Sequence, residues 1–235
     1  MNCWPEVSVR AKIDGMATRS TRTRSSYHHG DLRAALVGAG AELARTGGPE
    51  AIVLREVTRI VGVAPNAVYT HFATLAELKS AVAQHALREM AAAMLSHLAQ
   101  VEEPADAPGA AEVHLREVGR AYVHFALDQP GLFRIAMDGN PDGVGTPGRG
   151  EKQRDFASED RPKPDTLLIA ALRRLTEAGL LPAEETDAAV MASWATVHGL
   201  ATILLNLQPF RSAAEREAAV DAGLHYLLRG LTSRT

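Results

Sequence analysis

Apolar residues recur at helical spacing along most of this 235-residue chain. Leu32, Leu36, Ala39 and Leu43, for example, are spaced by four, three and four residues, which places them on one face of a helix. Alternating apolar and polar runs, the pattern of a half-buried strand, are scarce. The pattern predicts an all-α protein with about nine helices. They are expected at residues 31–45, 54–61, 65–71, 75–100, 111–127, 132–137, 165–178, 182–207 and from 212 onward.

Capping signals mark where several of these helices begin. Thr74 with Glu77, and Ser212 with Glu215, have the spacing of capping boxes, in which each side chain accepts from the other residue's backbone N–H. Asp165 can cap the seventh helix. Two stretches read as loops: residues 101–109, and residues 138–164 with five Gly and four Pro. The second is a surface loop or a gate.

Residues 54–72 read as two short helices joined by a tight turn. Val57, Ile60 and Val61 give the first helix one apolar side. Gly62 permits the sharp turn that follows. An ordinary helical hairpin is the alternative interpretation.

The second helix of this pair is expected to begin at Pro65, where a missing N–H costs nothing. Val68 and Phe72 lie four residues apart, so this helix can face back onto its partner. Small and polar side chains then point elsewhere, as a helix that reads the major groove of DNA requires. These outward residues are Asn66, Ala67, Thr70 and His71.

The run Tyr69-x-His71-Phe72, followed by Thr74-Leu-Ala-Glu77-Leu78, resembles the DNA-binding domain of the TetR family of bacterial transcriptional regulators. The resemblance covers about residues 27–82. The opening Tyr27-His28-His29-Gly30-Asp31-Leu32-Arg33 is similar to one branch of that family. Trp194-x-x-x-His198-Gly199-Leu200 is similar to the Trp-His-Gly signature in the C-terminal domain of the same branch.

The resemblance implies that Tyr69 and His71 contact backbone phosphate, while Asn66, Ala67 and Thr70 approach base edges. Asn can form paired hydrogen bonds with adenine, and Ala or Thr methyl groups can meet a thymine methyl. The set expected at DNA is Arg55, Pro65, Asn66, Ala67, Tyr69, Thr70 and His71.

The sequence departs from the family pattern at two positions. Ala64 stands where a capping Ser is common, and Leu75 stands where a Lys is common. Lys79 could replace the phosphate contact of that Lys.

The resemblance and the charge distribution suggest three segments. Residues 1–26 form a basic arm with Arg10, Lys12, Arg19, Arg22 and Arg24, which is either a disordered tail or a DNA-contacting arm. Residues 27–80 form the helix-turn-helix DNA-binding domain, and residues 81–235 a helical ligand-binding and dimerisation domain. Residues 1–80 hold 10 Lys and Arg against 7 Asp and Glu, and the remainder holds 15 against 21. A basic head on an acidic body suits attachment of a DNA-binding module.

Aromatic and Met residues of the C-terminal part are candidates for a small-molecule pocket. Ordinary core packing is the alternative for each of them. The candidates are Tyr122, Phe125, Phe133, Met137, Met191, Trp194 and His198. An apolar ligand suits this lining, and Arg134 or His198 could orient an anionic group.

The last two helices carry more apolar surface than one contact needs. Residues 188–205 are apolar nearly all round, and Val220, Leu224 and Leu228 belong to a stripe on the last helix. In the TetR family these helices form a four-helix dimer interface; an intramolecular core is the alternative. The apolar run contains Ser, Thr, His and Gly and reads as a buried helix rather than a membrane span.

The expected function is that of a homodimeric, cytoplasmic repressor that binds near-palindromic double-stranded DNA and is released by a small apolar or amphipathic effector. A DNA-binding dimer without a ligand and a helical small-molecule enzyme are the alternatives. No catalytic motif is evident, no cofactor or metal is expected, and the single Cys3 excludes a Cys-cluster zinc site. Residues 1–15 lack a secretory core, and Met16 is a second possible start.

Overall fold

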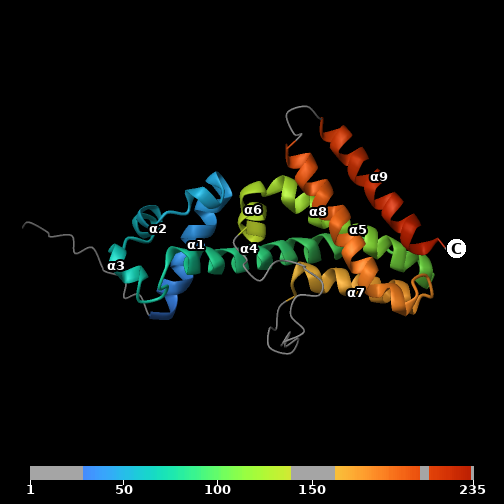
Figure 1. Ribbon diagram of the computed structural model, residues 1–235, viewed down its shortest axis with the longest axis horizontal. Coiled ribbons are helices and arrows are strands. Elements are labelled where there is room, and N and C mark those ends of the chain that lie inside the picture. Colours follow the sequence, from blue (N-terminus) through green and yellow to red (C-terminus); the bar gives the residue numbers. More distant parts are fainter. Residues whose placement is uncertain (1–28, 139–161, 207–211, 234–235) are drawn as a thin grey trace, which may run out of the picture.

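The computed structural model describes residues 29–138, 162–206 and 212–233. This part of the chain is all-helical, and Figure 1 shows its arrangement. Two short 3-10 helices, η1 (Pro49–Ala51) and η2 (Ala183–Glu185), join longer elements. The α-helices are α1 (His29–Gly47), α2 (Leu54–Val61), α3 (Pro65–Val68), α4 (Leu75–Leu98), α5 (Ala107–Asp128), α6 (Pro130–Asp138), α7 (Pro164–Glu177), α8 (Thr186–Asn206) and α9 (Ala213–Thr232).

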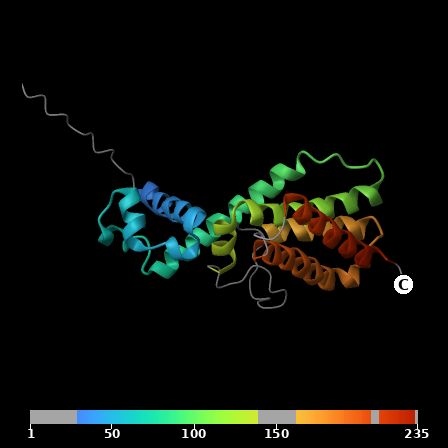
Figure 2. The same cartoon turned by 90° about the horizontal axis from the view of Figure 1, so that it is seen from above.

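The molecule is elongated, with a small head at one end and a larger helical body at the other. Figures 1 and 2 show α1, α2 and α3 forming the head, and α4 running from the head into the body. Leu78, Val82, Met90 and Met94 on α4 are all at most 1% exposed. Full burial of such a side chain stabilises the fold by about 1.5–3 kcal/mol. One helix therefore takes part in the cores of both halves.

Of the two predicted capping boxes, the one at Ser212 is complete and the one at Thr74 is half formed. Thr74 Oγ1 accepts from the Glu77 N–H at 3.1 Å, although the Glu77 carboxylate accepts from the N–H of Ala73 rather than of Thr74. Ser212 Oγ accepts from the Glu215 N–H at 3.2 Å, and the Glu215 carboxylate accepts from the Ser212 N–H at 2.7 Å. Local sequence therefore fixes the starts of α4 and α9.

Helix α5 begins earlier than the sequence suggested. Residues 107–110 were expected in a loop or at its edge, but Asp106 caps them by accepting from the Gly109 N–H at 2.7 Å. Pro108 lies in the first turn, where its missing N–H is not needed. The sequence interpretation gave the prolines too much weight as breakers and missed this cap.

The expected cap of α7 is also corrected. Asp165 lies inside the first turn of the helix, and Lys163 is the N-cap residue. The Thr166 hydroxyl accepts from the Lys163 N–H at 2.9 Å and closes the turn. Similarly, residues 183–185 form η2 rather than the first turn of α8, which begins at Thr186.

Helix α2 does not bury the face that was expected. Val57 is fully buried and Thr58 is 4% exposed, whereas Ile60 is 45% exposed. The Thr58 hydroxyl donates to the Arg55 carbonyl oxygen at 3.1 Å, so this polar side chain satisfies itself within the helix. Leu54, Val57, Thr58 and Val61 have the spacing of one helical face, and Ile60 lies outside it.

Head and body meet tightly where α1 ends. The Arg45 guanidinium donates to Gln129 Oε1 at 2.9 Å and to the Glu89 carboxylate at 3.0 Å. A Cβ built on Gly131, in the first turn of α6, would lie only 1.9 Å from the Ala44 carbonyl oxygen. Only glycine allows α6 to approach the end of α1 this closely.

A charged clamp holds α9 against α5. Arg120 on α5 donates to Glu217 and Asp221 on α9, and also pairs with Glu117 on its own helix. His124 Nε2 lies 2.9 Å from the Glu217 carboxylate, one turn further along α5. These contacts fix the register of the last helix over the body.

Helix α8 is apolar but incompletely covered within one chain. With η2 it is long and apolar enough to cross a membrane by length and composition, at a mean hydropathy of 1.6, and 28% of its most apolar window is buried. Composition alone is weak grounds for a span, because core helices of soluble proteins share it. No second helix of this kind occurs among the described residues.

The expected basic arm at residues 1–26 and nearly all of the expected loop at 138–164 lie outside the described residues. Cys3, Met16 and the Tyr27-His28 start of the family-like run lie there as well.

Candidate functional site

The head contains the predicted helix-turn-helix. Helix α2 ends at Gly62, whose φ of 78° lies in the left-handed region and whose N–H donates to the Thr58 carbonyl oxygen. Helix α3 starts at Pro65 after an Ala64 N-cap that makes no side-chain bond. Val68 is 2% exposed, so α3 packs back onto α2 as predicted.

Helix α3 is shorter than expected. It ends at Val68, and the chain continues as a turn in which the N–H groups of His71 and Phe72 both donate to the Val68 carbonyl oxygen at 2.9 Å. Phe72 is 3% exposed, and the Arg33 guanidinium lies 4.9 Å from its ring centroid. The turn is therefore anchored by one buried ring that α1 covers.

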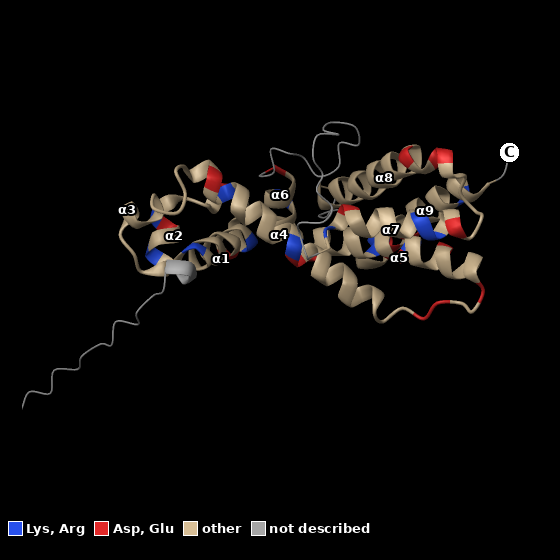
Figure 3. Cartoon of the chain, turned by 90° about the horizontal axis from the view of Figure 1, so that it is seen from below, with Lys and Arg blue, Asp and Glu red and all other residues tan. Residues whose placement is uncertain are grey.

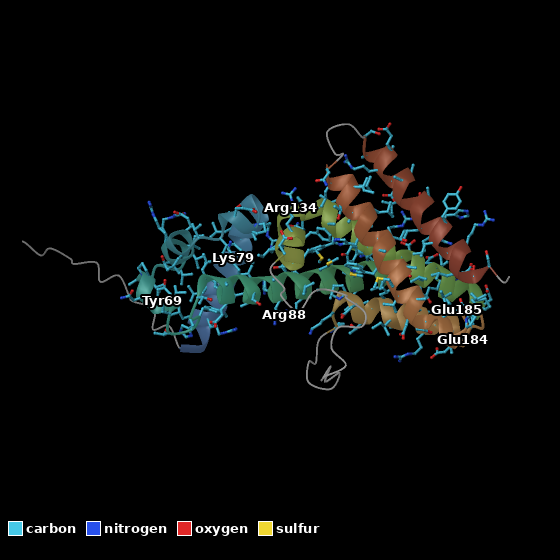
Figure 4. The ribbon with its side chains drawn as sticks, viewed as in Figure 1. Tyr69, Lys79, Arg88, Arg134, Glu184 and Glu185 are labelled. Carbon is cyan, nitrogen blue, oxygen red and sulfur yellow. The ribbon has the colours of Figure 1, made fainter. Side chains whose placement is uncertain are left out.

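The residues expected at DNA share one exposed end of the head. Tyr69 is 55% exposed and the Arg55 side chain 91% exposed. Figure 4 shows Tyr69 at the end of the molecule remote from Glu184 and Glu185 in the body. The remaining members of the set, which are exposed or partly exposed, are Pro65, Asn66, Ala67, Thr70 and His71.

Local bonding defines what this surface can offer. The Thr70 hydroxyl donates to the Ala67 carbonyl oxygen at 2.7 Å, which leaves its methyl group and its two acceptor lone pairs for outside contacts. Arg59 pairs with Glu56 at 2.8 Å, whereas Arg55 lies 3.9 Å from the same carboxylate and is more exposed. Figure 3 shows Lys and Arg positions on α1 and α2 of the head.

The departure from the family pattern at Leu75 concerns the charge at the start of α4. Leu75 is 36% exposed at the start of α4 and offers no charge. Lys79 lies one turn further on and is partly exposed, and Figure 4 shows it on the head side of the molecule.

The body contains a small apolar cavity between α4, α5, α7, α8 and α9. Its volume is about 50 Å³, which is room for a few water molecules. The lining residues are Met94, Leu115, Val118, Gly119, Tyr122, Pro164, Asp165, Leu168, Val190, Ser193, Trp194, Val197 and Leu227.

An aromatic cluster adjoins the cavity through Tyr122 and Trp194. The Trp194 and His198 rings stack at 5.0 Å, and the Phe133 ring lies 5.7 Å from His198 and 5.8 Å from Tyr122. The Tyr122 O–H donates to Met137 Sδ at 3.7 Å, and Tyr122 Oη lies 3.1 Å from His198 Nδ1. Both contacts are hydrogen bonds if His198 carries its proton on Nδ1.

Burial keeps this pair uncharged. It raises the pKa of the Tyr122 phenol above its usual range and lowers the pKa of the His198 imidazole. At neutral pH both groups are therefore neutral, and the cluster presents polar atoms without charge.

Two buried polar atoms of the cavity wall have no hydrogen-bond partner among the described residues. They are Ser193 Oγ and Trp194 Nε1, on consecutive residues of α8. Ser193 is 1% exposed. Leaving such a group unpaired costs about 1–3 kcal/mol of folding free energy. Thr196, on the same helix, avoids this cost by donating to the Ala192 carbonyl oxygen at 2.8 Å.

The structure gathers five of the seven expected pocket residues and separates two. Tyr122 and Trp194 line the cavity, and Phe133, Met137 and His198 form the adjoining cluster. Phe125 is 7% exposed and Met191 is 39% exposed, and neither lines the cavity. Arg134 is exposed on α6 and lies on the outside of the molecule in Figure 4.

Most of the aliphatic lining escaped the sequence reasoning, which looked for aromatic and sulfur-containing side chains. Leu115, Val118 and Leu168 line the cavity but were not among the candidates. Gly119 was the available signal, because a Cβ there would meet Leu224 Cδ2 at 2.6 Å. A glycine inside a long apolar helix marks a close approach of elements.

A helix-turn-helix head joined to an all-helical body with an apolar cavity defines a class of transcription factor. Residues 115–227 match the family model described as "Tetracyclin repressor-like, C-terminal domain". The match identifies residues 115–227 as a C-terminal domain of the TetR family of transcriptional regulators, and the helix-turn-helix head precedes this domain in the chain. This family is one of regulators rather than of enzymes.

Solved structures share the fold over most of the chain. A protein of unknown function from Rhodococcus sp. RHA1 is 22% identical, with a TM-score of 0.63 over 89% of this chain and 100% of that one. A TetR family regulator from Shewanella sp. PV-4 is 15% identical, with a TM-score of 0.59 over 86% and 99%. A single-substitution variant of TetR from Acinetobacter baumannii AYE, in complex with minocycline, is 21% identical, with a TM-score of 0.56 over 85% and 97%. The search of curated proteins gave no match.

Proposed function

We propose that this regulator is a homodimeric repressor that binds a near-palindromic operator through its head and leaves it when a small molecule enters the body. The DNA-binding domain is residues 27–80, the arm is 1–26, and residues 81–235 bind the effector and the second subunit. The observation that carries the proposal is the exposed α2–α3 end of the head, mounted through α4 on a body with an apolar cavity.

The head carries the chemistry that a major-groove reader needs. Pro65 and Asn66 begin α3 in exposed positions, so the amide of Asn66 can reach an adenine edge. Tyr69 and His71 follow in the turn and can reach phosphate, together with Arg55 at the start of α2. Ala67 and the methyl group of Thr70 suit a thymine methyl.

Replacing Arg55 by Gln is expected to weaken binding to any duplex about threefold to tenfold and to lower the slope of log Kd against log salt by about one. The reason is the loss of one phosphate contact, with its counterion release. Fluorescence anisotropy with a labelled duplex, titrated between about 50 and 200 mM salt, measures both quantities. Arg173→Gln, at an exposed position on α7 in the body, is the matched control and should leave the slope unchanged. An equal loss in both variants would assign the effect to overall charge.

The partly bare face of α8 supports a dimer. Ile203 is 55% exposed on α8 and Tyr226 is 71% exposed on α9. A Cβ built on Gly199 would meet nothing within 4 Å among the described residues of one chain, so this glycine has open space beside it for another helix. A second copy of α8 and α9 would cover these positions and explain why α8 is apolar nearly all round.

Ile203→Glu is expected to convert the dimer into monomers, because the carboxylate would be buried at the interface between two copies. Sedimentation velocity at micromolar concentration measures the oligomeric state. Leu95→Glu is the control, since Leu95 is also exposed, at 39%, but lies on α4. A variant that remains dimeric while the control dissociates would place the interface on α4 instead.

The cavity supports a ligand-responsive body. One structurally similar TetR protein is bound to minocycline, and another, RolR, is bound to resorcinol. The cavity is too small here for most effectors, so a ligand would have to move its walls apart. A body packed solid by its own side chains would have favoured the alternative of a dimer without ligand.

Helix α6 offers a physical route from this cavity to the head. Phe133 and Met137 on α6 contact the cluster beside the cavity, and Gly131 on the same helix packs on Ala44 at the end of α1. A ligand that displaced Tyr122 would push on α6 and change the angle of the head. If the ligand binds more tightly to the protein with the changed head angle, it lowers the DNA affinity by the ratio of its affinities for the two arrangements.

A further inference from the structure

The polar atoms of the cavity wall restrict what can bind there. No Lys or Arg lines the cavity among the described residues, and Asp165 is its one acidic lining residue. The Asp165 carboxylate is partly exposed, and Oδ1 already accepts from the Thr166 N–H at 2.8 Å in the first turn of α7. An anionic ligand would find no cation in the wall and would be repelled by this carboxylate.

The hydroxyl of Tyr122 is already satisfied and so contributes little to recognition. It pairs with Met137 and His198 behind the cavity wall. A ligand that claimed this hydroxyl would have to break those contacts. The polar groups that gain from a new partner are therefore the two without one, Ser193 Oγ and Trp194 Nε1.

These two atoms have a shared chemistry. The Trp194 indole is a donor only, and the Ser193 hydroxyl can donate and accept. Both atoms are almost completely covered, so each has left water without gaining a hydrogen-bond partner among the described residues. A ligand that enlarges the cavity between α5 and α8 and brings an acceptor to α8 would remove that penalty.

We propose that the effector is a compact, uncharged and mainly apolar molecule with a carbonyl-type hydrogen-bond acceptor, which accepts from Trp194 Nε1–H and Ser193 Oγ–H. This specificity rests on the proposed function of the body as an effector domain. The apolar remainder of the molecule contacts Val118, Leu168 and Val197. The two donors on α8 recognise the acceptor of the ligand. The absence of a lining cation in the described residues selects against acidic ligands.

Four probes of matched size separate the possibilities: acetophenone with a neutral carbonyl, cumene with no polar atom, benzoate as the anion and α-methylbenzylamine as the cation. Titration calorimetry with the full chain gives a Kd for each. We expect acetophenone to bind about fivefold to tenfold more tightly than cumene. We expect benzoate, for which the one charged lining group is the Asp165 carboxylate, to bind at least roughly 100-fold more weakly than acetophenone. We expect the amine to bind more weakly than acetophenone as well, because its ammonium must leave water and cannot accept from the Trp194 and Ser193 donors.

The indole N–H resonance of Trp194 tests the contact directly. The chain has two tryptophans, so Trp4 is an internal reference, and Trp194→Phe assigns the signals. Acetophenone should shift the Trp194 N–H downfield, and cumene should shift it less. In Ser193→Ala/Trp194→Phe, acetophenone and cumene should bind equally, whereas Thr196→Ala on the same helix should keep the preference.

Several outcomes overturn the proposal. They are equal binding of cumene and acetophenone to the wild type, tighter binding of either charged probe, an unmoved Trp194 resonance, and no binding by any probe up to its solubility. The indole measurement uses wild-type protein and does not depend on whether the double variant folds. DNA binding is measured separately. If the protein binds DNA but not acetophenone, only the proposed ligand class is wrong. If it binds acetophenone but not DNA, only the proposed regulator function is wrong.

Discussion

Asn66→Ala/Tyr69→Ala/His71→Ala is expected to abolish sequence-specific DNA binding, with Kd for a selected operator rising at least roughly 100-fold. The change removes the side chains proposed to make one base contact, from Asn66, and two phosphate contacts, from Tyr69 and His71. Each contact is expected to be worth on the order of 1–2 kcal/mol. Their sum, about 3–6 kcal/mol, exceeds the roughly 2.7 kcal/mol that corresponds to a 100-fold change in Kd. Anisotropy titration against the operator and a scrambled duplex gives the affinity and the specificity ratio.

The fold of the head should survive these substitutions. Val68 and Phe72, which anchor α3 and the following turn, remain in place. Glu184→Ala/Glu185→Ala, at the opposite end of the molecule in Figure 4, is the control for altered surface charge. If the triple variant kept its operator affinity within about threefold, this surface would not be the reader.

Gly131→Ala is expected to lower the free energy of unfolding by roughly 3 kcal/mol and to weaken operator binding as well. The new methyl group would lie 1.9 Å from the Ala44 carbonyl oxygen, and backbone cannot yield as a side chain can. Helix α6 must therefore move away from α1, which also strains the bonds of Arg45 with Gln129 and Glu89. Chemical denaturation and the operator Kd are the two measurements.

Gly38→Ala is the matched control for this substitution. Gly38 lies within α1, and a Cβ there would meet nothing within 4 Å. Alanine should stabilise α1 by about 0.5–1 kcal/mol, because it loses less backbone freedom than glycine. Comparable destabilisation by both substitutions would show that the α6–α1 contact is not what holds the head to the body.

The sequence predicted the helical class and the head well because short-range rules govern both. The stripe of α1, the Gly62 turn and the Pro65 start each depend on neighbouring residues. Ile60 was placed wrongly for a local reason: Thr58 can bury its hydroxyl by bonding within α2, and spacing alone did not reveal this. The recognition residues themselves came from family resemblance rather than from periodicity.

The cavity was only half predictable, because it depends on how several helices meet. Residues from α4, α5, α7, α8 and α9 form its wall, and no local pattern brings Val118, Leu168 and Leu227 together. Aromatic spacing on α8 singled out Trp194, which lines the cavity, and His198, which stacks on it, but it also included Met191, which is 39% exposed. The unpaired Ser193 hydroxyl was invisible in the sequence, since its lack of a partner is a property of packing.

The decisive measurement is a selection from sheared genomic DNA with the purified full-length protein at moderate salt, followed by sequencing of the retained fragments. A dimeric reader should enrich one near-palindromic motif whose half-sites lie about one helical turn, roughly 34–36 Å, apart or a multiple of it. The triple head variant, run alongside, should enrich nothing. Retained DNA with the composition of the input, from a protein shown to be folded and dimeric, would contradict DNA reading by this chain.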